Sequence, residues 1–239
     1  MFGKNVLVKQ EKEADGILSV NSMFYTIQGE GPNAGEPALF IRLQGCNLRC
    51  AFCDTEFDSG QPMTVDEVCK KVLTYPIQSW IISPLIVITG GEPMVQADLP
   101  DLVLKLLHQG FRVQVETAGT LWQEGLENPE IYDDPHFQIV CSPKTGKINK
   151  KLEKRLTAYK YVLTDGKISE LDGLPNRSPE TDKEMIIHRP KNYEVPVYVM
   201  PCDEHDPDKN ENNEQVCVDA VLRFGYRLCL QMHKHLGLE

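Results

Sequence analysis

Three cysteines lie within eight residues, at Cys46, Cys50 and Cys53, with the spacing Cys-x3-Cys-x2-Cys. Thiolates this close together favour a shared metal centre or a strained disulfide. Structural zinc sites are closed by four ligands, whereas three protein ligands leave a position open for chemistry, and thiolates are also the usual ligands of iron–sulfur clusters. The spacing therefore predicts a metal centre with an open position. A zinc site completed by a distant His or Cys is the alternative.

A second segment with chemical potential is Thr-Gly-Gly-Glu-Pro at residues 89–93, directly after an apolar run. Glycines let exposed backbone approach a ligand closely, and the carboxylate of Glu92 is suited to an ammonium group. Alone, this pattern also fits an ordinary loop. Together with the cysteine motif, it indicates a ligand-binding site.

Alternating strands and helices are expected to position these segments. We predict strands at residues 37–43, 85–89, 112–116, 137–141, 159–163, 195–199 and 227–230. We predict helices at residues 64–73, 99–108, 148–157 and 214–224, the first opened by a Thr64–Glu67 capping box. The alternation favours a mostly parallel sheet, and about six units are too few for a full eight-fold barrel. One domain covers residues 1–239, with a core at about 22–236 and an insertion at about 165–189.

Composition narrows the class of protein. The chain has 239 residues, of which 41% are hydrophobic and 25% charged, as in ordinary globular domains. A net charge of −10 argues against nucleic-acid or anionic-membrane partners. The longest apolar run, residues 81–88, is too short to span a bilayer, and no signal peptide is visible. We therefore expect a cytoplasmic protein. Five further cysteines stand singly among apolar neighbours and are expected to be buried: Cys69, Cys141, Cys202, Cys217 and Cys229.

The cysteine motif and the Gly-Gly-Glu-Pro segment together resemble the radical S-adenosylmethionine (SAM) superfamily. Further motifs resemble the 7-carboxy-7-deazaguanine synthase family of the queuosine pathway. They lie, in this order, at residues 24–31, 40–45, 53–55 (Cys-Asp-Thr), 116–120, 142–144 (Ser-Pro-Lys) and 231–234. The resemblance covers residues 24–235, whereas residues 1–20, 122–136 and 165–189 carry none of it.

The resemblance implies an incomplete (β/α)6 barrel of the radical SAM type, within the α/β class. It also implies a lyase that converts 6-carboxy-5,6,7,8-tetrahydropterin to 7-carboxy-7-deazaguanine with loss of ammonia. In that family a four-iron, four-sulfur (4Fe-4S) cluster reduces bound SAM, and the resulting 5′-deoxyadenosyl radical takes hydrogen from C6 of the pterin. The hydrogen is later returned and SAM is regenerated. The implied partners are an electron donor such as flavodoxin or ferredoxin, and a second copy of the chain in a homodimer.

The resemblance also implies a role for individual residues. The cluster ligands would be Cys46, Cys50 and Cys53, and Thr55 would bind Mg²⁺, which prefers hard oxygen ligands. The SAM site would be lined by Phe52, Cys53, Asp54, Gly91, Glu116, Ser142, Pro143 and Lys144. The pterin would contact Ile27, Gln28, Gly29, Arg42 and Thr89, with the Arg42 guanidinium matched to a carboxylate. His233 and His235 are interpreted as solvated residues near the chain end.

Two departures from the family pattern concern single positions. The chain has Thr-Ala-Gly at residues 117–119, which lacks a hydrogen-bonding side chain found in relatives, and its Met200-Pro201 pair lacks the Gln that often precedes such a pair. The competing functions are another radical SAM enzyme, such as a glycyl-radical activase, or a non-enzymatic zinc or iron–sulfur protein. A turnover assay with a small substrate distinguishes them.

Overall fold

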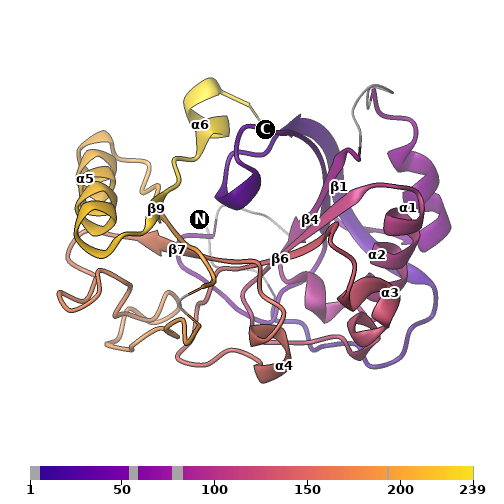
Figure 1. Cartoon of the computed structure of the whole chain (residues 1–239), viewed down its shortest axis with the longest axis horizontal. Helices are drawn as coiled ribbons and strands as arrows, with labels where there is room; N and C mark the ends of the chain where they lie inside the picture. The colour runs from indigo at the N-terminus through magenta and orange to yellow at the C-terminus, as the bar shows by residue number, and fades with distance from the viewer. Residues whose placement is uncertain (1–5, 54–58, 77–82, 193, 239) are drawn as a thin grey trace.

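The fold is built on one open sheet of nine strands. The computed structural model describes residues 6–53, 59–76, 83–192 and 194–238. In pairing order the strands are β3 (Gln61–Thr64), β1 (Ile17–Ile27), β2 (Pro37–Leu43), β4 (Leu85–Gly90), β5 (Arg112–Thr117), β6 (Phe137–Cys141), β7 (Ala158–Leu163), β8 (Val197–Pro201) and β9 (Arg227–Leu228). From β2 to β9 each pair is parallel, and β3 and β9 are the two ends of the strand order, so the sheet curves without closing (Figure 1). The predicted incomplete barrel is confirmed.

The helices are α1 (Val65–Val72), α2 (Leu99–His108), α3 (Pro129–Tyr132), α4 (Lys150–Glu153), α5 (Pro207–Phe224) and α6 (Met232–Leu236). Helices α1, α2 and α5 pack on the outside of the sheet, whereas α6 contributes His233 and Lys234 to the lining of the cavity. Figure 1 shows α1, α2 and α3 gathered at one end of the sheet and α5 at the other. Short 3-10 turns lie at η1 (Gly31–Asn33), η2 (Pro93–Val95) and η3 (Glu124–Glu127).

The two faces of the sheet differ because side chains alternate along each strand. On the outer face, Ile41 and Ile88 are fully buried in the core that α1 and α2 share. Burial of such a side chain contributes about 1.5–3 kcal/mol. On the inner face, the register places Arg42 beside Thr89, and Glu116 beside Val140. Polar side chains at the carboxyl ends of successive strands therefore point into the barrel.

Local signals explain where the helices begin and end. In α1, the Thr64 hydroxyl accepts the Glu67 N–H at 3.2 Å, and the Glu67 carboxylate accepts the Thr64 N–H at 2.8 Å, which confirms the predicted capping box. Helix α2 has the predicted bounds, and Gly110 follows it with a φ of +86°. The five scattered cysteines are all buried, as predicted.

Some elements differ from the prediction. Strands β1 and β3 were not expected; they pair antiparallel with each other at one end of the sheet. Helix α5 begins at Pro207 instead of residue 214, because the Asp206 carboxylate accepts the N–H groups of Asp208 and Lys209. Helix α4 spans only four residues within the predicted range 148–157.

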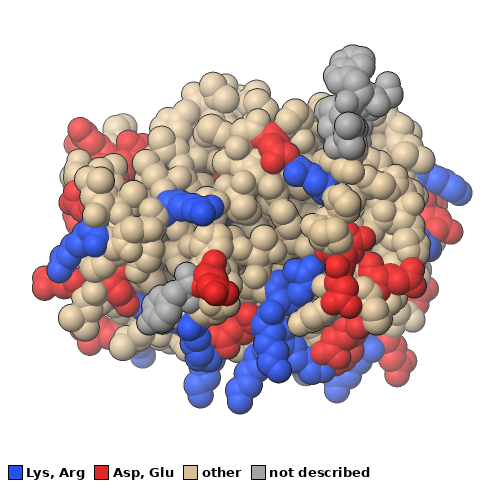
Figure 2. Space-filling view, viewed as in Figure 1, with Lys and Arg blue, Asp and Glu red and all other residues tan. Residues whose placement is uncertain are grey.

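No helix in the described part of the chain is long and apolar enough to cross a membrane. Figure 2 shows basic and acidic side chains interleaved along the lower part of one face, without a continuous basic stripe there.

Candidate active site

One cavity of about 760 Å³ lies at the carboxyl ends of the parallel strands. This volume is within the range of small-molecule sites. Most of the predicted site residues line it: Ile27, Gln28, Arg42, Cys46, Cys50, Phe52, Cys53, Thr89, Gly91, Glu116, Ser142, Pro143 and Lys144. Asp54 and Thr55 lie outside the described residues. Gly29 does not line the cavity but packs directly behind His233, which does.

The cysteine loop forms one wall of this cavity. None of the three cysteines forms a disulfide, and all three are half-buried. Burial raises the pKa of the Cys46 thiol to about 12, and the Glu92 carboxylate and the other two cysteines add to that rise while the Leu48 N–H opposes it. Such thiols become thiolates most readily on a strongly positive centre. Within the described residues, no three His, Cys, Asp or Glu side chains are grouped to hold a single metal ion.

Glycines let the loop after β4 pack against the cysteine loop. A Cβ atom on Gly91 would lie 1.9 Å from the Gly45 carbonyl oxygen and 2.9 Å from Cys46 Cβ. The backbone of Gly91 donates to the Leu43 carbonyl oxygen at 3.2 Å, and that of Glu92 to the Gly45 carbonyl oxygen at 2.9 Å. The glycines thus bring two cavity-lining segments together. The three cysteines line one cavity together with the glycine backbone of the loop after β4. Three thiols in such a place would fit an iron–sulfur cluster that has three protein ligands.

Glu92 has a structural role in place of the ammonium-binding role that its motif suggested. Its side chain is fully buried and does not line the cavity. The carboxylate accepts the Thr117 hydroxyl at 2.7 Å, the Ala118 N–H at 2.8 Å and the Met94 N–H at 3.1 Å. Burial raises its pKa, and these three donors oppose the rise. Glu92 therefore joins the ends of β4 and β5.

The Ser-Pro-Lys segment at residues 142–144 follows β6 and also lines the cavity. The Ser142 N–H donates to the Thr117 carbonyl oxygen at 2.8 Å, which continues the β5–β6 pairing. Lys144 Nζ donates to Ser142 Oγ at 2.8 Å and lies 5.0 Å from the centre of the Phe52 ring. Burial lowers the pKa of Lys144. The segment thus joins the cysteine loop to β6 through a cation–π contact.

Arg42 occupies the opposite wall, on a strand between β1 and β4 and not at a sheet edge. Its guanidinium lies 5.0 Å from the centre of the Phe24 ring, which stacks on Phe40 at 5.2 Å. No carboxylate among the described residues pairs with it. A guanidinium that lies over an aromatic ring, itself stacked on a second ring, is suited to bind the carboxylate of a ligand.

The inner end of the cavity holds a buried ionic network that sequence reasoning missed. Lys160 Nζ donates to Glu30 Oε2 at 2.5 Å and to Glu116 Oε2 at 2.9 Å. Glu116 Oε1 accepts Gln28 at 3.1 Å, and Glu30 Oε1 accepts Gln231 at 2.9 Å. The available signal was a lysine inside the otherwise apolar run Tyr-Lys-Tyr-Val-Leu at residues 159–163. Charged side chains are rarely buried unless they are paired.

Two further parts of the wall were also missed. His233 is half-buried and lines the cavity, and a Cβ atom on Gly29 would lie 2.1 Å from its Nδ1, so its interpretation as a solvated residue is wrong; His235 is exposed as expected. The connection between β7 and β8, which includes the predicted insertion 165–189, contributes Arg177, Pro179 and Ile187. This segment carries none of the motifs, so no pattern indicated its position.

Comparisons with known proteins show what this chain is similar to. A model of the Radical SAM superfamily matches residues 40–139. A Rhodospirillum rubrum protein named 7-carboxy-7-deazaguanine synthase is 40% identical over 100% of both chains. A Rickettsia prowazekii protein of the same name is 39% identical over 100% of this chain and 96% of its own. The crystal structure of QueE from Escherichia coli, 24% identical, covers 90% of this chain and 94% of its own with a TM-score of 0.65, which supports the fold.

Proposed function

The chain belongs to the 7-carboxy-7-deazaguanine synthase family of radical SAM enzymes, and we propose that its cavity holds SAM beside 6-carboxy-5,6,7,8-tetrahydropterin. As a member of that family it is a lyase that uses a 4Fe-4S cluster, SAM, a small-molecule substrate and a reductant. The proposed reaction converts the pterin to 7-carboxy-7-deazaguanine with release of ammonia. The observation that carries the proposal is that the cysteine loop and Arg42 line one continuous cavity.

On the cysteine side, we propose that Cys46, Cys50 and Cys53 hold the cluster. When bound, the cluster supplies the electron that cleaves SAM to a 5′-deoxyadenosyl radical. Phe52, Asp54, Gly91, Ser142, Pro143 and Lys144 would bind SAM together with Cys53. Glu116 would accept a ribose hydroxyl. A carboxylate has about four lone-pair sites. Gln28, Gln114 and Lys160 donate to three of those of Glu116, which leaves one for the ribose.

On the opposite side, Arg42 would bind the pterin carboxylate, assisted by Thr89, which lies beside it in the register. Ile27 and Gln28 would contact the ring from the end of β1, whereas Gly29, which does not line the cavity, would leave room for His233. The Gln28 amide is held by Glu116, so its orientation is fixed before the ligand binds. In this arrangement Arg42 fixes the position of C6, the carbon that bears the carboxylate.

A magnesium ion is proposed beside the pterin carboxylate, with Thr55 as its protein ligand. Support comes from the chemistry of the ligand, since Mg²⁺ binds few protein groups and completes its shell with substrate and water oxygens. Thr55 lies outside the described residues, so the assignment follows from the Cys-Asp-Thr motif alone. Omission of Mg²⁺ should lower turnover of the native protein and leave that of Thr55→Ala nearly unchanged.

We also propose a homodimer, a flavodoxin or ferredoxin as reductant, and a cytoplasmic location. For the dimer, support comes from exposed apolar side chains at the β9 end of the sheet. Leu228 on β9 is 41% exposed, and Leu222 on α5, which contacts β9, is 80% exposed. Exposed apolar side chains at and beside an edge strand favour a protein partner. Light scattering on the purified protein tests the dimer, and a reduction assay with each donor tests the reductant.

The function is tested by anaerobic turnover of protein reconstituted with iron and sulfide. The mixture contains dithionite, SAM, Mg²⁺ and 6-carboxytetrahydropterin, and products are followed by mass spectrometry. Formation of 7-carboxy-7-deazaguanine supports the proposal. Formation of 5′-deoxyadenosine without the deazapurine contradicts the substrate and favours another radical SAM activity. Absence of both cluster and cleavage contradicts the enzymatic assignment as a whole.

A further inference from the structure

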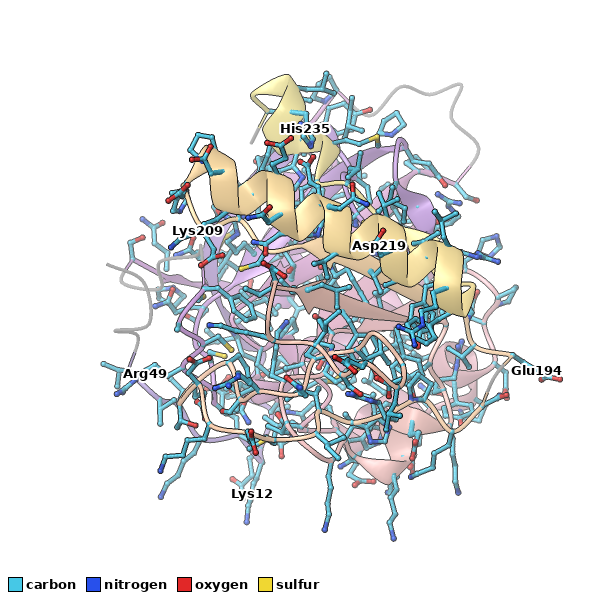
Figure 3. All side chains as sticks on the ribbon, turned by 90° about the vertical axis from the view of Figure 1, so that its left-hand side faces the viewer. Lys12, Arg49, Glu194, Lys209, Asp219 and His235 are labelled. Atoms are coloured by element: carbon cyan, nitrogen blue, oxygen red, sulfur yellow. The ribbon has the colours of Figure 1, made fainter. Side chains whose placement is uncertain are left out.

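The connection between β7 and β8 holds the cysteine loop on both sides of Cys50. The Arg49 N–H donates to Glu180 Oε1 at 2.7 Å, and the Ala51 N–H donates to the Pro179 carbonyl oxygen at 2.8 Å. Arg49 lies at the molecular surface in Figure 3, so the contact is made at the rim of the cavity. A segment without family motifs thus fixes the backbone of a proposed cluster ligand.

The turn that contains Glu180 is closed by hydrogen bonds of its own. Ser178 is buried, and its Oγ accepts the Glu180 N–H at 3.3 Å. Its backbone N–H donates to the Lys183 carbonyl oxygen, and its carbonyl oxygen accepts the Asp182 N–H, both at 2.9 Å. Arg177 Nη1 donates to the Asp182 carbonyl oxygen at 2.9 Å. The carboxylate is therefore held toward the cysteine loop by a closed turn and not by one flexible side chain.

The direction of the loop amides has a chemical consequence. The Leu48 N–H points to Cys46 Sγ at 3.4 Å, whereas the connection accepts the N–H groups of Arg49 and Ala51. Hydrogen bonds to the sulfur atoms, net charge and solvent exposure set the reduction potential of an iron–sulfur cluster. The N–H groups of Arg49 and Ala51 do not donate to the sulfur atoms, so they do not stabilise a reduced cluster. The Glu180 carboxylate repels an added electron. Both features disfavour reduction of the cluster.

Glu180 acts next to Cys50, because it accepts the N–H of Arg49, the residue that precedes this cysteine. Lys144 lies over the ring of Phe52, two residues after Cys50, and Glu180 is exposed. One positive and one negative side chain thus contact the loop that carries Cys50.

We propose that Glu180 is a positioning residue that fixes the cluster-binding loop and keeps the reduction potential of the bound cluster low. A strongly reducing cluster suits the cleavage of a sulfonium, which requires an electron of low potential. The inference rests on the family assignment, which implies the cluster, and does not depend on which substrate the cavity binds.

The charge effect is tested with Glu180→Gln, which keeps an oxygen acceptor for the Arg49 N–H but removes the charge. Glu170→Gln is the matched control: it makes the same charge change at an exposed position of the same connection. Each protein is reconstituted, its iron and sulfide are quantified, and the cluster is titrated with reductant under electron paramagnetic resonance, without substrate. At the wild-type midpoint, the ratio of reduced to oxidised cluster should be about threefold to tenfold higher in Glu180→Gln, the effect expected when one nearby negative charge is removed from a partly solvated site.

The effect should shrink at high salt, because Glu180 is exposed and its charge is screened. Glu170→Gln should match the wild type. The positioning effect is tested with Glu180→Ala, which also removes the acceptor and should lose cluster absorbance in air several-fold faster than Glu180→Gln. The inference would be overturned if the reduction potential of Glu180→Gln at low salt equalled that of wild type and of Glu170→Gln. It would also be overturned if the cluster lasted equally long in Glu180→Ala and in wild type. Wild-type protein that takes up no cluster would overturn the family-derived cofactor as well.

Discussion

Lys160 on β7 places its Nζ 2.9 Å from Glu116 Oε2 on β5, although β6 lies between these strands. The same nitrogen donates to Glu30, so one cation pairs with two carboxylates. The Lys160 side chain is 6% exposed and those of Glu116 and Glu30 are 17% and 15% exposed. The contact joins β5 and β7 to Glu30, which lies between β1 and η1, and gives this end of the cavity one excess negative charge.

Replacement of this lysine should destabilise the protein strongly. Lys160→Met leaves two carboxylates close together without their cation, and we expect a loss of about 3–5 kcal/mol in the free energy of unfolding at pH 7. Lys105→Met is the control, since Lys105 pairs with Asp66 and Asp101 at the surface and its loss should have little effect. Urea unfolding measures both variants. Equal losses would contradict a special role for the buried network.

The network should also make stability depend on pH. Burial acts to raise the pKa of Glu30, but the charge and hydrogen bond of Lys160, with the hydrogen bonds and charges around it, lower it to about 2. A lowered pKa contributes stability that is present above the ordinary value of about 4.5 and is lost as the pH falls toward 2. Glu30→Gln should therefore be less stable than wild type by on the order of 2–3 kcal/mol at pH 7.

This deficit should shrink as the pH is lowered below about 4.5. Urea unfolding midpoints of both proteins, measured at steps from pH 7 to pH 3, check the prediction. A deficit that stays constant over this range would show that Glu30 does not act through its charge.

Arg42 should decide recognition of the carboxylate of the substrate. Arg42→Gln removes the charge and the bidentate geometry, and we expect KM for the pterin to rise about 10- to 100-fold. Arg42→Lys keeps the charge but loses the flat contact with Phe24, so its KM should lie between those of wild type and Arg42→Gln. Steady-state kinetics give KM, and cluster content serves as the control. An unchanged KM in Arg42→Gln would place the carboxylate elsewhere in the cavity.

A side chain at Gly91 should displace the cysteine loop. In Gly91→Ala the added Cβ would lie 1.9 Å from the Gly45 carbonyl oxygen, which is far too close for any relaxed contact. We expect at least a several-fold loss of bound iron and sulfide per chain after reconstitution. Gly146→Ala is the control, because its Cβ would meet only the Ile186 carbonyl oxygen at 3.2 Å. Full cluster content in Gly91→Ala would contradict the close packing of the two loops.

Much of this site could be predicted from the sequence because its residues follow strands. Residues at the carboxyl ends of parallel strands meet at one edge, so Arg42, Thr89, Glu116 and Ser142 converge as soon as the strands are recognised. The Thr64–Glu67 capping box and the glycine after α2 were local signals of the same kind.

The remainder depends on contacts between distant segments. No local pattern shows that Lys160 meets Glu30, 130 residues earlier in the chain, or that Glu180 reaches Arg49. The role of Glu92 was misjudged for a similar reason, since its partner Thr117 lies on another strand. His233 belongs to the site only because Gly29 leaves room for it.

The account rests on SAM and the pterin lying side by side in one cavity, and transfer of deuterium tests this most directly. Wild-type protein is incubated anaerobically with dithionite, Mg²⁺, SAM and 6-carboxytetrahydropterin deuterated at C6, and both SAM and the product are examined by mass spectrometry. We predict 7-carboxy-7-deazaguanine, little net loss of SAM, and deuterium in the recovered SAM. Product formation with unlabelled SAM, or SAM cleavage without transfer from C6, would contradict the account.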